Sequence, residues 1–123
     1  MKNVLVVEDS KAIRSMIRVS LEETGGFFAV EAGNGFEALK TLPSRRFDLI
    51  ITDINMPDIN GLELISYLKS NPTYRGIPLI IVSTEKTEED KKRGIALGAS
   101  GYVEKPFTKE QLITTVAKVL GEI

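Results

Sequence analysis

The sequence predicts an α/β domain built on a five-stranded parallel sheet. Five short apolar runs alternate with longer segments of helical periodicity along the 123 residues, and this alternation is typical of a parallel sheet covered by helices. The expected strands are Asn3 to Val7, Phe28 to Ala32, Leu49 to Thr52, Leu79 to Ser83 and Gly101 to Glu104. The first, third and fourth runs are almost continuous Val, Leu and Ile, which indicates burial on both faces. We therefore expect the second and fifth strands at the edges of the sheet.

The segments between these runs carry the periodicity of amphipathic helices. Apolar residues recur at helical spacing in two of them, at Ile13, Met16, Ile17 and Leu21 and at Leu112, Val116, Val119 and Leu120. Thr108 and Gln111 form a capping box that predicts the start of the last helix. The segment from Thr87 to Leu97 also opens on a capping pair, Thr87 with Asp90, but its apolar residues lie only at its end. We expect that helix to be weakly anchored on the sheet.

Composition limits the partners of the chain and its location. The 16 Lys and Arg residues nearly balance the 17 Asp and Glu residues, and no long basic run is present, so neither nucleic acid nor an anionic membrane is expected as the main partner. The apolar runs are much shorter than the roughly 18 residues that a membrane-spanning helix needs. We expect one cytoplasmic domain that fills residues 1–123.

The residues that are absent limit the chemistry. The chain has no Cys and no His, which excludes disulfides, thiolate zinc sites, cysteine nucleophiles and histidine bases. Any reaction must use carboxylates, hydroxyls, lysines or a bound metal ion. Oxygen ligands favour a hard cation such as Mg²⁺.

Polar side chains follow four of the five expected strands at their carboxyl ends, where open α/β sheets bind their ligands. They are Glu8 and Asp9, Asp53, Ser83 and Thr84, and Glu104 with Lys105 and Pro106. Two carboxylates about 4 Å apart repel each other by about 4 kcal/mol at an effective dielectric constant of about 20. A divalent cation would remove this repulsion, so the sequence predicts a magnesium site.

The same residues suit metal-assisted phosphoryl transfer. Asp53, in the middle of the group, is the natural nucleophile, because a carboxylate can attack phosphorus to give an acyl phosphate. Lys105 and the Ser83 hydroxyl could bind the remaining phosphoryl oxygens.

Each of these residues also has an ordinary structural explanation when it is taken alone. Asp9 or Ser10 could cap the helix that follows, and Asp53 could open a polar turn after which Asn60 caps another helix. Lys105 could be a solvated side chain. The functional hypothesis depends on their convergence at one edge of the sheet.

Four segments together resemble the receiver domains of two-component response regulators, in particular the single-domain, CheY-like ones. They are Val6-Val7-Glu8-Asp9-Ser10, Asp53-Ile54-Asn55-Met56-Pro57 with Asp58 and Gly61, Ile81-Val82-Ser83, and Tyr102-Val103-Glu104-Lys105-Pro106-Phe107. The resemblance covers the whole chain and implies one receiver domain over residues 1–123. It also implies a flavodoxin-like (βα)5 fold, a doubly wound five-stranded parallel sheet with strand order 2-1-3-4-5.

The resemblance assigns a role to each residue at the edge. Asp53 would accept a phosphoryl group from a sensor histidine kinase, a histidine phosphotransfer protein or a small phosphodonor. Mg²⁺ would be held by Glu8, Asp9, Asp53 and the backbone carbonyl of Asn55. Ser83 and Tyr102 would be the switch residues and Lys105 the essential ammonium, with the Lys105-Pro106 peptide bond cis.

Three positions bear on the rate of the reaction. Thr84 stands where the family more often has Ala or Gly, and its bulk could slow the entry of a phosphodonor or of water. Asn55 and Glu85 match a pair seen in CheY-like regulators with short-lived phosphoryl groups, which argues the other way. Glu8 in place of Asp, and Ser83 in place of Thr, both occur in the family.

The resemblance implies output through protein contact and no enzymatic activity beyond the protein's own phosphorylation and dephosphorylation. The Thr87 to Leu97 helix, the Gly101 to Glu104 strand and the last helix would present a changed surface to a downstream protein. The protein would be a monomer, with a dimer possible on phosphorylation. Lys11, Arg14 and Arg18 form a basic stripe where the family docks its phosphodonor, although a solvated charged face is the stronger explanation.

Three alternatives stay open. A pseudo-receiver would keep the fold as an interaction module without phosphorylation. Gly33-Asn34-Gly35-Phe36-Glu37-Ala38 matches a dinucleotide-binding fingerprint, but it follows the second strand and leaves the acidic residues unexplained, so Asn34 more simply caps a helix. A phosphohydrolase would need a second Asp where the chain has Asn55.

Overall fold

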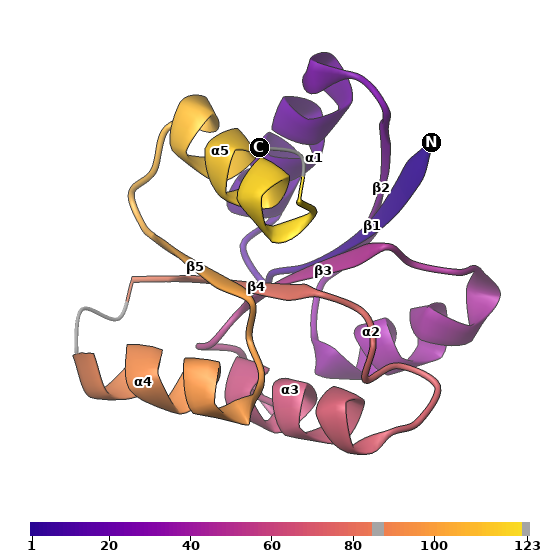
Figure 1. Ribbon diagram of the computed structural model, residues 1–123, viewed down its shortest axis with the longest axis vertical. Helices are drawn as coiled ribbons and strands as arrows, with labels where there is room; N and C mark the ends of the chain where they lie inside the picture. The colour runs from indigo at the N-terminus through magenta and orange to yellow at the C-terminus, as the bar shows by residue number, and fades with distance from the viewer. Residues whose placement is uncertain (85–87, 122–123) are drawn as a thin grey trace.

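The computed structural model describes residues 1–84 and 88–121 and contains a parallel sheet with helices on both faces (Figure 1). Its strands are β1 (Lys2–Val7), β2 (Phe27–Ala32), β3 (Leu49–Asp53), β4 (Leu79–Ser83) and β5 (Gly101–Glu104). The strand order is β2-β1-β3-β4-β5. The predicted fold class, strand order and edge strands are confirmed. β3 extends to Asp53, one residue further than predicted, because Asp53 still pairs with Val82.

The helices lie in two layers. The helices are α1 (Lys11–Thr24), α2 (Gly35–Thr41), α3 (Gly61–Ser70), α4 (Glu88–Leu97) and α5 (Lys109–Val119), and a 3-10 turn, η1 (Leu42–Ser44), follows α2. Helices α1 and α5 cover one face of the sheet, and α2, α3 and α4 cover the other (Figure 1). β1, β3 and β4 are therefore buried on both faces, as their apolar runs predict.

The α1 and α5 stripes form the core on their face of the sheet. Ile17, Leu21, Leu112 and Val116 are buried against the apolar residues of the central strands. Met16 was expected in this stripe, but it is 38% exposed. It lies at the margin of the α1 stripe, and the small side chain of Ser20 is buried there instead.

The capping residues lie where the sequence predicts them. Thr108 and Gln111 form the capping box of α5, Asn60 forms a capping box with Glu63 at the start of α3, and Ser10 caps α1. The predicted Thr87 and Asp90 box lies partly outside the described residues.

Helix α4 has few apolar anchors, as its sequence indicates. Gly94 is its only buried residue, and it packs against Ile81 of β4. No helix in the described part of the chain is long and apolar enough to span a membrane.

Candidate functional site

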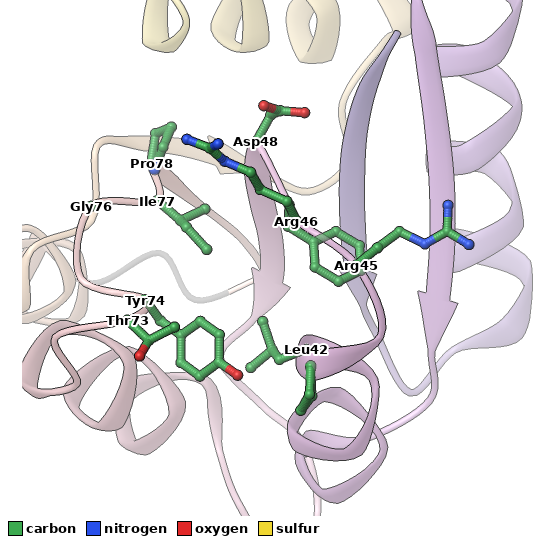
Figure 2. Close-up of a pocket in the computed structure, with 11 residues that line it drawn as sticks. Leu42, Arg45, Arg46, Asp48, Thr73, Tyr74, Gly76, Ile77 and Pro78 are labelled. Carbon is green, nitrogen blue, oxygen red and sulfur yellow. The ribbon is translucent and has the colours of Figure 1, made fainter.

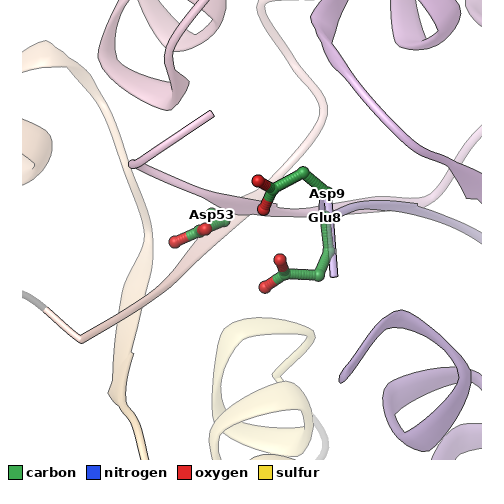
Figure 3. Close-up of side chains that lie close together, drawn as sticks. All are labelled: Glu8, Asp9 and Asp53. Atoms are coloured by element: carbon green, nitrogen blue, oxygen red, sulfur yellow. The ribbon is translucent and has the colours of Figure 1, made fainter. Parts of the chain in front are cut away.

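Three carboxylates meet where β1 and β3 end. One oxygen each from Glu8, Asp9 and Asp53 lies within 4.8 Å of the others, and the three side chains converge on one region (Figure 3). Glu8 and Asp53 are buried, at 2% and 5% exposure, whereas Asp9 is exposed. The predicted convergence of these three residues is confirmed.

Lys105 reaches the carboxylates from the loop between β5 and α5. Its Nζ atom lies 2.6 Å from Glu8 Oε1 and 3.5 Å from Asp53 Oδ2. The Lys105-Pro106 peptide bond is cis, as the family resemblance implies. One ammonium therefore faces three carboxylates, so the site carries excess negative charge that a divalent cation would neutralise.

The turn after β1 holds Glu8 and Asp9 in place. The Glu8 backbone N–H donates to Ala32 O at 3.1 Å, which continues the pairing with β2 one residue beyond β1. The Ser10 N–H donates to Glu8 Oε2 at 2.9 Å, and the Ser10 hydroxyl caps α1. Glu8 is therefore held by both its backbone and its side chain, and Asp9 lies between a strand end and a helix cap.

A folded-back loop supports Asp53. The Gly61 N–H donates to Ile54 O at 2.8 Å, and the Gly61 Cα packs so closely on the Asp53 carbonyl that a Cβ would overlap its oxygen. Asp58 in this loop has a φ of 67°, a conformation that Asp tolerates better than most residues. The start of α3 is therefore packed directly against the residue that carries the central carboxylate.

Burial raises the pKa of both inner carboxyls. For Asp53 the removal of water raises the pKa, while Lys105 and the backbone N–H groups of Ile54 and Asn55 oppose this rise. Burial also raises the pKa of Glu8, against the hydrogen bond from Lys105. The protein thus does not fully offset the negative charge of the ionised carboxylates. Their oxygen atoms are ligands that suit a magnesium ion.

The predicted switch residues lie on the neighbouring strands. Ser83 ends β4, is fully buried, and follows Val82, the residue that pairs with Asp53. Tyr102 on β5 is half-buried, and Lys91 Nζ lies 5.8 Å from the centre of its ring. Thr84 is exposed just beyond β4, and Glu85 lies outside the described residues. The access and lifetime roles of Asn55, Thr84 and Glu85 stay predictions.

The two arginines of the basic stripe on α1 pair with other residues of the protein. Arg14 Nε lies 2.9 Å from Glu31 Oε1, and Arg18 Nε lies 2.7 Å from Glu31 Oε2. Arg14 Nη1 also donates to the backbone carbonyl of Glu8 at 2.8 Å. Sequence reasoning missed this contact with the acidic turn, although Arg14 lies four residues after the Ser10 cap, where helix geometry turns it back toward that end of the sheet.

The glycine-rich segment after β2 is accounted for by local hydrogen bonds. The Asn34 side chain accepts from the Glu37 N–H at 2.8 Å and so caps α2, as the simpler interpretation predicts. The Gly33 N–H donates to Glu37 Oε2 at 2.9 Å. These contacts occupy groups that a nucleotide phosphate would need.

A cavity of about 630 Å³ lies at the amino-terminal ends of β3 and β4, on the opposite side of the sheet from the strand ends that carry the acidic residues (Figure 2). Its lining includes Phe47, Asp48, Tyr74, Ile77 and Pro78. These residues lie before β3 and β4, whereas the acidic residues lie at the carboxyl ends of the strands. The cavity is therefore separate from the acidic site.

A doubly wound sheet in the order β2-β1-β3-β4-β5, with acidic residues and a lysine at its carboxyl edge, defines the CheY-like class of signalling proteins. Residues 4–117 match the response regulator receiver domain family, and the chain belongs to that family. Receiver domains act as signalling switches. They are phosphorylated by sensor kinases or phosphotransfer proteins, and they act on downstream targets.

Two solved structures are similar to this chain over nearly its whole length. The chemotaxis protein CheY4 of Vibrio cholerae is 38% identical with a TM-score of 0.90, and the match covers 97% of this chain and 98% of that one. The signal receiver domain of a signal transduction histidine kinase from Syntrophus aciditrophicus is 33% identical with a TM-score of 0.89, over 100% and 92% of the two chains.

A longer curated relative is a transcriptional regulator. The phosphate regulon transcriptional regulatory protein PhoB of Escherichia coli (strain K12) is 35% identical over 122 residues, which are 99% of this chain and 53% of PhoB. The chain therefore spans about half the length of the curated relatives that it matches.

Proposed function

We propose that the chain is a phosphorylation-dependent switch whose acceptor is Asp53. The observation that carries this proposal is the convergence of Glu8, Asp9 and Asp53 with Lys105 at one edge of the sheet. In the proposed reaction an Asp53 carboxylate oxygen attacks the phosphorus of a phosphohistidine on a sensor kinase or phosphotransfer protein. The donor's N–P bond breaks and its electron pair returns to the imidazole, so the donor recovers its histidine.

Glu8, Asp9, Asp53 and the Asn55 carbonyl would hold Mg²⁺. When bound, this ion neutralises charge on the transferring phosphoryl group. The buried carboxylates suit this role because their raised pKa values show that the protein alone does not fully stabilise their charge.

Lys105 and Ser83 would bind the oxygens of the new phosphoryl group. Lys105 Nζ is already 3.5 Å from an Asp53 oxygen, and Ser83 ends the strand that pairs with β3. The added negative charge would draw both side chains toward Asp53 and allow Tyr102 to change its rotamer.

The signal would leave through α4, β5 and α5. Helix α4 buries only Gly94, which suits an element that shifts at low cost. We propose a downstream protein as the target, a cytoplasmic setting, and a monomer that can dimerise on phosphorylation. We do not propose nucleic acid or a membrane as a binding partner of this chain.

The test is phosphorylation by acetyl phosphate, followed by intact mass measurement. We expect a single phosphoryl adduct on the wild type that requires Mg²⁺ and is lost in Asp53→Asn. Asp58→Asn is the matched control, because it removes a carboxylate from the same loop and Asn tolerates the positive φ at this position. This control should still form the adduct.

Two results would contradict the proposal. An adduct that persists in Asp53→Asn would place the acceptor elsewhere. A protein that binds Mg²⁺ but forms no adduct with acetyl phosphate or a phosphorylated histidine domain would instead support the pseudo-receiver alternative.

A further inference from the structure

Arg14 connects α1 with the turn that carries the acidic residues. Its side chain is only 16% exposed. Its Nε donates to Glu31 Oε1 at 2.9 Å, and its Nη1 donates to the Glu8 backbone carbonyl at 2.8 Å. The guanidinium is therefore fixed from two directions, by an edge strand and by the acidic turn.

The anchor of this arginine is itself well held. Glu31 also accepts from Arg18 Nε at 2.7 Å, and Arg18 Nη1 reaches Glu22 Oε1 at 3.2 Å. Arg14 and Arg18 thus share one carboxylate, and Arg14 also donates to the Glu8 backbone carbonyl. This difference between two neighbouring arginines makes the role of Arg14 testable.

The Glu8 carbonyl lies at a sensitive point of the backbone. Pairing between β1 and β2 ends with the bond from the Glu8 N–H to Ala32 O, so the carbonyl projects beyond the paired strands. Because the peptide unit is planar, a hydrogen bond to this carbonyl also fixes the N–H and Cα of Asp9. The Asp9 side chain starts from that Cα, so the hydrogen bond helps to set its starting point.

Asp9 is the member of the acidic group that most needs such support. Glu8 is buried and its carboxylate is bonded to Ser10 and Lys105, and Asp53 lies at the end of a central strand. Asp9 is exposed on a turn. The backbone that precedes Asp9 therefore helps to set its approach to the other carboxylates.

We propose that Arg14 is a positioning residue for the cation site, which it serves by orienting the Glu8-Asp9 peptide. The inference rests on the proposed function in that the cation is the Mg²⁺ used for phosphorylation of Asp53. Arg14 does not touch the reacting atoms. It acts through the backbone, in the way that residues behind metal ligands commonly hold those ligands in place.

Electrostatics and positioning predict opposite signs for the loss of Arg14. Removing a positive charge near three carboxylates should strengthen the binding of a cation. Removing a hydrogen bond that orients Asp9 should weaken it. The sign of the change in Mg²⁺ affinity therefore separates the two effects.

The experiment titrates Mg²⁺ into the full chain by calorimetry and compares Arg14→Met with Arg18→Met. Both variants lose one positive charge, one ion pair with Glu31 and one further contact, which is with the Glu8 carbonyl for Arg14 and with Glu22 for Arg18. We expect about 10-fold weaker Mg²⁺ binding in Arg14→Met and no weakening in Arg18→Met. Arg14→Lys keeps the charge but cannot span both partners in the same way, so it should also bind Mg²⁺ more weakly.

Two further measurements exclude a general loss of structure. Thermal unfolding should show similar losses of stability in the two methionine variants, because each breaks an ion pair with Glu31 and one further hydrogen bond. The rate of phosphorylation by acetyl phosphate in Arg14→Met should fall at low Mg²⁺ and recover at saturating Mg²⁺. If Arg14→Met does not fold, the comparison of Arg14→Lys with Arg18→Lys replaces it.

The outcomes distinguish this inference from the proposed function. Mg²⁺ binding in Arg14→Met that equals or exceeds that of the wild type would overturn the positioning role. A wild type that binds Mg²⁺ but is not phosphorylated would overturn the proposed function, and the affinities of the variants would still test Arg14. A wild type that does not bind Mg²⁺ would overturn both.

Discussion

The buried contact between Lys105 and Glu8 is a short ion pair, with 2.6 Å between Lys105 Nζ and Glu8 Oε1. It joins residues 97 positions apart in the chain. Both side chains are at least nine-tenths buried. Loss of Lys105 therefore leaves the Glu8 carboxylate buried without a counter-ion, whereas loss of Glu8 still leaves Asp53 3.5 Å from Lys105 Nζ. The pair between Lys105 and Glu8 therefore affects the stability of the fold as well as the chemistry of the site.

We expect Lys105→Met to destabilise the Mg²⁺-free protein by about 2 kcal/mol at neutral pH, because Glu8 loses its buried partner. Added Mg²⁺ should recover part of this loss. Urea unfolding with and without Mg²⁺ measures both effects. Lys109→Met is the matched control, since its pair with Glu23 is exposed and should contribute less than about 1 kcal/mol. Equal losses in the two variants would contradict the prediction.

At the scale of elements, the connection from β3 to α3 is the most tightly constrained part of the site. Gly61 begins α3 and packs against the backbone of Asp53 and Ile54. Backbone atoms cannot move aside as a side chain can. The position of α3 is therefore coupled to the position of the central carboxylate.

We expect Gly61→Ala to destabilise the protein by about 2 kcal/mol, because its Cβ would overlap the Asp53 carbonyl. Phosphorylation by acetyl phosphate should slow as well. Gly76→Ala is the control, since a Cβ at that position meets nothing within 4 Å. Urea unfolding of the two variants provides the comparison, and a Gly61→Ala protein as stable as Gly76→Ala would show that the loop can relax.

For the whole molecule, the acidic site couples stability to pH. Burial raises the pKa of Asp53 in the folded protein above its ordinary value near 3.8. The folded state therefore binds this proton more tightly than the unfolded state does. Stability falls as the pH rises from the ordinary pKa through the raised one, and the loss is complete above the raised pKa.

We expect Asp53→Asn to be more stable than the wild type at neutral pH in Mg²⁺-free buffer, because it removes this cost. The advantage should shrink as the pH falls through the raised pKa of Asp53 and disappear near its ordinary value. Saturating Mg²⁺ should also reduce it. Thermal unfolding across this pH range checks the prediction, with Asp58→Asn as the control, and an advantage that grows toward acid pH would contradict it.

The fold class, the strands and most of the candidate site were predictable from the order of the amino acids alone. Apolar runs that end in polar residues mark strand ends, and parallel strands bring these ends to one edge, so the convergence of Glu8, Asp9 and Asp53 was predictable. The caps at Asn34, Asn60 and Thr108 were predictable as well, because capping depends on residues three positions apart. Both predictions need only the order of residues along the chain and the rule that the carboxyl ends of parallel strands lie on the same side of the sheet.

The pairing of charged side chains was visible only in the folded protein. The bond from Lys105 to Glu8 and the sharing of Glu31 by Arg14 and Arg18 were not predicted, and the role of Lys105 toward a phosphoryl group stays a prediction. The exposure of Met16 and the contact of Arg14 with the Glu8 carbonyl were also not predictable. Such contacts depend on the rotation of each helix over the sheet and on rotamers, and these are set by packing between segments far apart in the chain.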